Sequence, residues 1–367
     1  MALTKVDPSV VNDQVFGRRN LVINGAMRVA QRGTSATTLS TTSEIFRVDR
    51  FRVEQGTVTA NNGTTEVSTD VPSGQGFTKS LKVTGGSSVS YGTNGFSAIN
   101  YRGEGQDFSQ VLHGTSSAKT VTISFWVKSS VTGTYSLNHT KYDGSTERFN
   151  VSEYTISQAN TWEYKKINVV GDTSVAASDW IRLYWHLGGD SGHKTATAGT
   201  WINGDATKRA TSSQPDMITT NGATFFLTGV QFELGSQATP FEHLTFAEDL
   251  ALCQRYYYRL VSGTEGSNYR FATGAAISTT QMDTHFQFQP QMRGTPSLDA
   301  MTAGNYRTNY DQDATSIFIV HATRTGTCVR TTHGSTQAQG FALFLNPSDF
   351  SGHTNTDAAY IAFDAEL

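Results

Sequence analysis

The sequence predicts an all-β fold, made of a jelly-roll β-sandwich, one short linking helix and a second, distal β-rich domain. Its length of 367 residues suits two domains and a tether. Apolar and polar residues alternate in many short segments, which is the period of a strand with one buried face. Turn dipeptides that supply the positive φ angles of tight hairpins separate these segments: Asn62-Gly63, Asn94-Gly95, Asp143-Gly144, Asn203-Gly204 and Asn221-Gly222.

Four parts are expected along the chain. The first is polar and irregular, as a solvated tether or a docking arm would be. No internal repeat is visible, so a β-helix built from stacked repeats is not expected. The parts are the arm over residues 1–19, the sandwich over 20–240, the linking helix over 241–260 and the distal β domain over 261–367.

Three segments of the predicted sandwich show the alternation most clearly. Each places its apolar residues on one face: Val121, Ile123, Phe125 and Val127; Ile181, Leu183, Trp185 and Leu187; and Phe226, Thr228, Val230, Phe232 and Leu234. In the second segment, Arg182, Tyr184 and His186 point the other way, outward from the core.

One helix is predicted after the sandwich. Thr245 and Glu248 form a capping box, in which the hydroxyl and the carboxylate each satisfy a free backbone N–H group. The helix is expected to end near Arg259. Four residues lie on one stripe of it: Phe246, Leu250, Cys253 and Tyr257.

The distal domain repeats the strand pattern. Its final segment alternates up to the last residue, which predicts a packed terminal strand rather than a trailing linker. The apolar side of that strand holds Ala359, Ile361, Phe363, Ala365 and Leu367. The strands of this domain include Thr284–Gln289, Ser316–Val320, Phe341–Leu345 and Tyr360–Leu367.

Composition and charge argue against several classes of protein. A net charge of −3 is unlike that of a nucleic-acid-binding protein, which usually carries a basic patch. The apolar runs are too short for insertion into a membrane, and the N-terminus lacks the apolar core of a signal peptide. Cys253 and Cys328 do not make a disulfide framework, which favours synthesis in a cytoplasm.

Signs of catalysis are weak. No catalytic motif, metal-binding motif or cofactor loop occurs in the sequence, so no enzyme activity, cofactor or metal is expected. Glu104 and Asp107 come nearest to a pair of glycosidase carboxylates, but a turn with two solvated acids explains them. His186 and His193 flank a glycine pair, and a surface hairpin explains their spacing.

Binding is easier to argue than catalysis. Sugars present flat apolar faces and many hydroxyl groups, so their sites combine exposed aromatic rings with short polar side chains. The candidates for a glycan groove are Tyr142, Tyr184, His186 and Trp201. Two alternatives stay open, namely that Trp201 plugs a loop and that Tyr184 packs beneath a neighbouring subunit.

Tyr256, Tyr257 and Tyr258 form an unusual triplet. Three successive residues at a helix end point in different directions, so one core cannot bury all of them. Contact with another subunit would explain the triplet, and we favour this interpretation. A transition from helix to strand, with the distal domain covering the rings, is the alternative.

Several of these segments resemble the jelly-roll domain of tail-fibre proteins from marine bacteriophages. The resemblance is carried at the start by Asn20–Gly25, Val29–Gly33 and Val48–Phe51, and at the end by Gly229–Gly235, Ala238–Glu242 and Glu248–Tyr257. Between them, segments in the order of a carbohydrate-binding jelly roll are Gly76–Val83, Phe125–Lys128, Gly133–Tyr135, Trp162–Tyr164 and Ile181–Trp185. The resemblance covers residues 18–260 and extends more loosely to the C-terminal region.

The resemblance implies a structural subunit of a tail fibre, located in the virion, that adheres to the host cell surface through glycans. It also implies a homotrimer that joins other phage tail proteins through its N-terminal region. Many carbohydrate-binding jelly rolls carry a calcium-ligating Asp in the last strand. Here Thr228–Val230 has no carboxylate, and Asp49 and Glu54 near the first strands are the alternative candidates for calcium ligands.

Two other functions stay open. One is a structural spacer or decoration protein of the virion without a ligand of its own. The other is an enzyme that degrades surface polysaccharide, which would need carboxylates clustered in a cleft.

Overall fold

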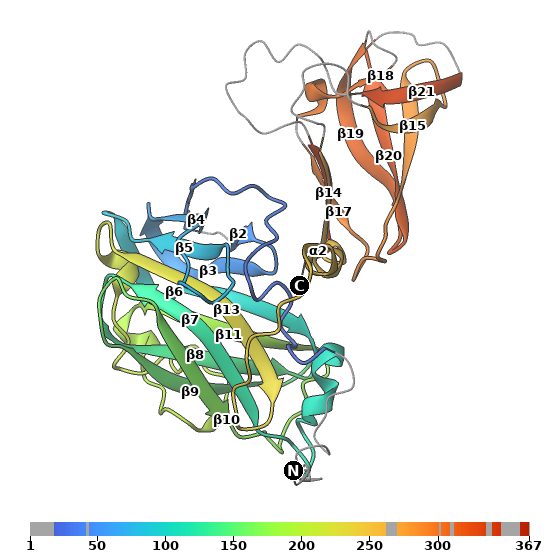
Figure 1. Ribbon diagram of the computed structural model, residues 1–367. Helices are drawn as coiled ribbons and strands as arrows, with labels where there is room; N and C mark the ends of the chain where they lie inside the picture. Colours follow the sequence, from blue (N-terminus) through green and yellow to red (C-terminus); the bar gives the residue numbers. More distant parts are fainter. Residues whose placement is uncertain are drawn as a thin grey trace, which may run out of the picture. The chain divides into compact units, whose positions relative to one another are not determined.

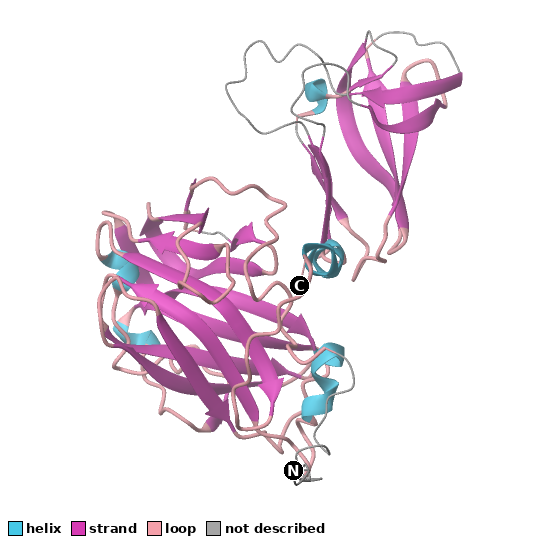
Figure 2. Ribbon diagram, in the orientation of Figure 1, coloured by secondary structure: helices cyan, strands magenta, loops and turns pink. Residues whose placement is uncertain are grey.

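The computed structural model describes residues 18–41, 44–261, 270–300, 302–308, 312–334, 340–345 and 360–366. The chain divides into two units, Met1–Phe246 and Ala247–Leu367. Strands far outnumber helices in the described part of each unit (Figure 2), so the prediction of an all-β fold is confirmed. Nearly all of the predicted arm, residues 1–19, lies outside the described residues. None of the helices in the described ranges has both the length and the apolar character needed to cross a lipid bilayer.

The first unit contains a six-stranded antiparallel sheet (Figure 1). Its long strands are rich in β-branched and aromatic residues, which suit a pleated, half-buried surface. In spatial order the strands are β1 (Thr37–Thr38), β4 (Thr64–Ser68), β5 (Ser80–Thr84), β13 (Thr224–Leu234), β7 (Val121–Ser129) and β10 (Glu163–Val169).

A seven-stranded antiparallel sheet stacks on the first. In spatial order its strands are β12 (Trp201–Asn203), β9 (Glu147–Ile156), β8 (Gly133–Tyr142), β11 (Trp180–Gly189), β6 (Val89–Glu104), β3 (Phe51–Asn61) and β2 (Glu44–Val48). Short 3₁₀ helices join some of the strands: η1 (Gly105–Val111), η2 (Ser191–His193) and η3 (Met217–Thr219).

The core lies between the two sheets. Trp185 of β11 is fully buried and meets Phe125 of β7 edge-on, with ring centroids 5.7 Å apart. The inward residues predicted for β7 and β11 all belong to this core, so those two alternations are confirmed. Burial of these large apolar side chains is the main stabilising contribution to such a sandwich.

The alternation predicted for β13 is only partly right. Val230 and Phe232 face the core as expected, but Phe225 and Leu227 do so in place of Phe226. The register of β13 against β7 shifts between Thr228 and Gln231, which exchanges the two faces of the strand.

Gly229 lies at this bulge. It has a φ of +62°, and a Cβ there would come within 2.6 Å of the Phe77 ring. The backbone conformation and the close ring contact together require glycine.

The N-terminal segment that carries the tail-fibre resemblance is a structural clasp. The Leu21 N–H donates to the Phe232 carbonyl at 3.0 Å, and the Val230 N–H donates to the Gly25 carbonyl at 2.9 Å. The Asn20 amide oxygen accepts from the Phe232 N–H at 3.0 Å. A Cβ on Gly25 would lie 2.0 Å from the Val230 carbonyl oxygen, so only glycine lets the two segments approach this closely.

Helix α2 (Phe246–Gln254), except for its first residue, opens the second unit, which continues into a three-stranded sheet. The prediction that the helix extends to Arg259 is wrong, because the β-favouring segment Tyr257–Val261 forms strand β14 instead. On the predicted stripe, Cys253 is buried but Phe246 is 54% exposed. The sheet has the order β14 (Tyr257–Val261), β22 (Tyr360–Asp364) and β17 (Ser297–Ala300).

A closed barrel forms the rest of the second unit (Figure 1). Its strands, in order around the barrel, are β15 (Arg270–Ala276), β16 (Gln281–Gln287), β20 (Gly326–His333), β19 (Gln312–Ala322), β18 (Arg307–Thr308) and β21 (Gly340–Leu345), and η4 (Ala303–Asn305) precedes β18. Ile361, Phe363 and Ala365 of the terminal strand region belong to the core of this unit, as predicted. Ala359 and Leu367 lie outside the described residues.

Candidate functional site

Tyr184 and His186 point away from the sandwich core, as their place in β11 predicts. They are nevertheless 1% and 0% exposed, so the interpretation that they line an open groove is wrong. The segment 190–214 folds back over this part of the sheet, where His193 stacks on Phe96 at 5.1 Å. The chain itself buries Tyr184, so a neighbouring subunit is not required to cover this residue.

His186 and His193 form an interior pair rather than a surface hairpin. The His193 Nε2 and His186 Nδ1 atoms lie 3.3 Å apart. Burial, and then the nearby positive charge of Arg209, lower the pKa of His193 to about 3. Burial, and then His193, hold the pKa of His186 well below its ordinary value. Both rings are therefore neutral at physiological pH, as packed parts of the fold.

Trp201 has a structural role, which agrees with the alternative that it plugs a loop. Its Nε1–H donates to the Val170 carbonyl at 2.7 Å. Its ring meets His139 at 5.1 Å and His113 at 5.6 Å. The half-buried indole thus closes the edge of the sandwich at β12 instead of standing in a groove.

Tyr142 is half-buried and faces the outer side of the seven-stranded sheet. Its ring stacks on Trp180, with centroids 4.9 Å apart, and its hydroxyl donates to the Gly144 carbonyl. Of the four predicted glycan residues, Tyr142 is the one that belongs to the part of this sheet not covered by segment 190–214.

That remaining part of the sheet is named here the polar face. Its residues come from four neighbouring strands and share the outer side of the sheet: Arg52, Glu54, Asn100, Arg102, Tyr142, Trp180 and Arg182. The sequence pattern placed Arg182 outward, but it gave no sign that three arginines gather there, because that depends on strand order.

The arginines of the polar face differ in their partners. Arg52 pairs with Glu44 at 2.8 Å and Glu54 at 3.0 Å. The Arg182 Nη1 donates to the Tyr184 hydroxyl at 2.9 Å. Arg102 lies over the Trp180 ring, with its guanidinium carbon 4.7 Å from the centroid.

The positive charges of the three guanidinium groups repel one another, and this changes the pKa of Arg102. Burial, and then the positive charges of Arg182 and Arg52, lower the pKa of Arg102 to about 10. Burial also disfavours the charged form of Arg182, but Tyr184 and Glu54 outweigh it and raise the pKa of Arg182. Both groups remain cationic at neutral pH.

The carboxylates considered for calcium have protein partners. Asp49 is buried and accepts from the Gln31 N–H at 3.0 Å and from its Nε2 at 2.6 Å. Glu54 pairs with Arg52. Among the described residues, no group of three His, Cys, Asp or Glu side chains is arranged to hold a metal ion. Of the acids considered for catalysis, Glu104 ends β6 and accepts from Gln106, and Asp107 is exposed in η1.

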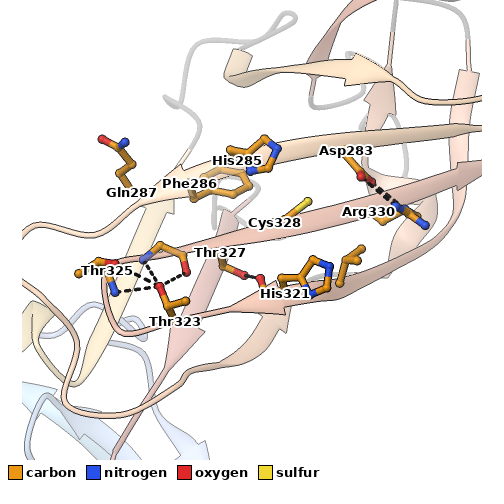
Figure 3. A pocket seen from close by; sticks show the side chains of 12 residues that line it. Asp283, His285, Phe286, Gln287, His321, Thr323, Thr325, Thr327, Cys328 and Arg330 are labelled. Atoms are coloured by element: carbon orange, nitrogen blue, oxygen red, sulfur yellow. Dashed lines mark hydrogen bonds and ion pairs between the residues drawn. The ribbon is translucent and has the colours of Figure 1, made fainter.

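A pocket of about 560 Å³ lies on the barrel of the second unit (Figure 3). At one end the Arg330 guanidinium donates two hydrogen bonds to Asp283, of 2.7 and 2.8 Å. His285, Cys328 and His321 lie in one row across β16, β20 and β19. Cys328 is 6% exposed, and burial followed by the negative charge of Asp283 raises the pKa of its thiol. Sequence reasoning missed this pocket, because only the strand register brings these residues together.

The tyrosine triplet follows the helix-to-strand alternative. Tyr256 and Tyr257 are 0% and 1% exposed within a single chain, so the interpretation that another subunit buries them is wrong. The Tyr257 hydroxyl donates to Asp299 at 2.7 Å. Tyr258 is half-buried and meets the Phe288 ring at 5.6 Å. Alternation in β14, which begins at Tyr257, sends the rings of Tyr257 and Tyr258 in different directions.

Comparison with known proteins finds distant structural likenesses. No protein-family model and no curated protein matches the chain. The enzymatically active domain of tailspike protein 4 of bacteriophage CBA120 aligns over 59% of this chain and 21% of its own, with 12% identity and a TM-score of 0.33. A xylan-binding domain from Paenibacillus barcinonensis aligns over 55% of this chain and 99% of its own, with 15% identity and a TM-score of 0.30. A family 11 carbohydrate-binding module of Clostridium thermocellum aligns over 56% and 98%, with 11% identity and a TM-score of 0.28. At these scores the likenesses carry no functional argument.

Proposed function

We propose that the chain is the structural subunit of a phage tail fibre that adheres to the host cell surface through glycans. The resemblance of residues 18–260 to tail-fibre proteins supports this role. The observation that carries it is the polar face, where charged, amide and aromatic side chains cover the outside of a sheet.

The polar face suits a polyhydroxylated ligand in its chemistry. Tyr142 offers a half-buried aromatic ring, and sugar rings pack their apolar faces on such groups. Glu54 accepts hydrogen bonds, and the arginines donate them, which are the two roles that sugar hydroxyls need. The polar face is the outside of a sheet, so its affinity for one sugar is expected to be modest.

We propose that multivalency raises the overall affinity when each single site binds weakly. A homotrimer presents the polar face three times, and linked weak sites gain about 10²–10⁴ in overall affinity. We propose that the trimer joins other tail proteins through its N-terminal region, that it is located in the virion and made in the host cytoplasm, and that it has no enzymatic activity.

Binding of the full-length chain to susceptible host cells and to an array of bacterial surface polysaccharides tests the proposal. Saturable binding is expected, and Tyr142→Ala should weaken it about tenfold or more. Tyr164→Ala is the matched control, because this 42% exposed tyrosine belongs to β10 of the other sheet.

Light scattering reports the oligomeric state in the same experiment, and reducing-end release reports any cleavage. A folded trimer that binds neither cells nor glycans would refute adhesion and favour the spacer function. Steady release of reducing ends would favour the polysaccharide-degrading enzyme.

A further inference from the structure

Arg102 and Arg182 of the polar face stand directly opposite each other on β6 and β11. Like charges in such cross-strand positions destabilise a sheet. Neither guanidinium forms an ion pair with a described residue. Among the described residues, the Arg182 guanidinium donates only to the Tyr184 hydroxyl and the Arg102 guanidinium has no hydrogen-bond partner. The Nε atoms of both are buried and unpartnered. The pair therefore places two positive charges on the sheet with no described carboxylate at ion-pair distance.

Arg52, on the same face, has its positive charge neutralised by ion pairs. Its guanidinium is held between Glu44 and Glu54, at 2.8 and 3.0 Å. Within the described ranges, the fold thus supplies two carboxylates to Arg52 and none at ion-pair distance to Arg102 or Arg182. The charge of the Arg102–Arg182 pair is free to meet an anion from outside.

Trp180 holds the two guanidinium groups in place. The guanidinium carbons of Arg182 and Arg102 lie 4.0 and 4.7 Å from its ring centroid, a favourable cation–π arrangement. Because these contacts and the Tyr142 ring leave the indole only 6% exposed, Trp180 cannot serve as an open stacking platform for a sugar. The face presents guanidinium groups where a site for neutral glycans would present bare aromatic rings.

Asn100 adds an independent observation. It pairs in register with Arg52 on one side and Tyr184 on the other, and it is fully buried. Neither its amide oxygen nor its amide nitrogen has a hydrogen-bond partner among the described residues. A buried polar group without a partner costs about 1–3 kcal/mol, so unmet hydrogen-bonding capacity lies beside the two arginines.

We propose that the Arg102–Arg182 pair binds the anionic group of an acidic saccharide, either the carboxylate of a uronic acid or a sulfate ester. The guanidinium fork matches both oxyanions in a bidentate manner. This inference rests on the proposed glycan binding and narrows the ligand to acidic polymers. Tyr142, stacked on the same tryptophan, then contacts the adjoining sugar ring.

Two pairs of polysaccharides separate the effect of the ligand's negative charge from that of its sugar rings. Polygalacturonate is compared with its methyl ester, and dextran sulfate with dextran, each against the full-length chain. Arg102→Gln with Arg182→Gln removes the pair. Lys166→Gln with Lys208→Gln removes two exposed positive charges elsewhere in the same unit and is the matched control. Arg102→Lys with Arg182→Lys keeps the charge without the fork, and it replaces the glutamine variant if that variant does not fold.

Tighter binding to at least one charged probe than to its neutral partner is expected, with affinity falling as salt rises. The glutamine pair should lose about tenfold or more of that affinity and the lysine pair a smaller part, while the control keeps it. Equal binding of charged and neutral probes, or an arginine variant that binds like the wild type, overturns the inference and leaves glycan adhesion standing. A folded chain that binds no glycan overturns both.

Discussion

Acid should destabilise the sandwich well above the pH at which its carboxylates titrate, because the first unit buries four neutral histidines: His113, His139, His186 and His193. Burial, and then the positive charge of Lys141, lower the pKa of His113 from 6.5 to about 4. The pKa of His193 falls to about 3, and those of His139 and His186 lie well below 6.5.

Proton linkage gives the sign of the change in stability with pH. These histidines have a lower pKa in the folded state, so the unfolded chain takes up protons first as the pH falls. The stability that they contribute is complete above pH 6.5 and is lost as the pH falls from 6.5 towards the folded values. Asp172, whose pKa is held at about 2 against burial by hydrogen bonds from Arg148, Ser174 and Lys141, loses its contribution only below pH 3.8.

At pH 5, a histidine with a folded pKa of about 4 or about 3 destabilises the fold by about 2 kcal/mol relative to pH 8. His113 and His193 alone therefore remove about 4 kcal/mol, a large share of the 5–15 kcal/mol of a typical domain. This corresponds to a fall of about 1 M or more in the urea midpoint.

Tryptophan fluorescence is a selective assay, because Trp126, Trp162, Trp180, Trp185 and Trp201 all belong to the first unit. Urea titrations at pH 8, 6.5, 5.5 and 5 should show a midpoint that is steady down to 6.5 and then falls. Midpoints at pH 8 and pH 5 that agree within about 0.3 M would refute the reasoning, since they would mean that the buried rings bind protons as readily as in the unfolded chain.

Three further substitutions test other features of the fold. His139→Phe should leave the urea midpoint at pH 7 unchanged or raise it, because both ring nitrogens of His139 are buried without partners, and it should lessen the acid effect. Gly25→Ala should destabilise the sandwich by about 3 kcal/mol in the same titration, because the new methyl group collides with the Val230 carbonyl. Tyr257→Phe should lower the second unit's stability by about 2 kcal/mol in thermal circular dichroism, through loss of the hydrogen bond to Asp299. An unchanged urea midpoint for Gly25→Ala, or an unchanged melt for Tyr257→Phe, would contradict the contact on which that prediction rests.

The sequence was sufficient for features set by neighbouring residues. Alternation from Ile181 to Leu187 predicts correctly which residues of β11 face the core. The bulge in β13 was also within reach, because a glycine inside a strand pattern, here Gly229, often marks one. The end of α2 was missed since the β preference of Tyr257–Val261 competes with the helical stripe, and pairing with β22 decides the outcome.

Features set by distant residues could not be predicted in this way. Outward alternation does not reveal that segment 190–214 returns to cover Tyr184 and His186. The Arg102–Arg182 pair depends on the strand order of the seven-stranded sheet. The row of His285, Cys328 and His321 likewise depends on how three strands of the barrel align.

The N-terminal clasp can form only late in the synthesis of the first unit. The hydrogen bond between Asn20 and Phe232 spans 212 positions, so the ribosome must add that many residues before the clasp can close. At 5–20 residues per second this takes about 10–40 s. From their own synthesis until the end of that interval, β5 and β7 lack β13, the strand that separates them, and their unpaired edges are open to other chains. When several copies of the chain are made close together, this waiting time is when wrong pairing between them competes with correct folding.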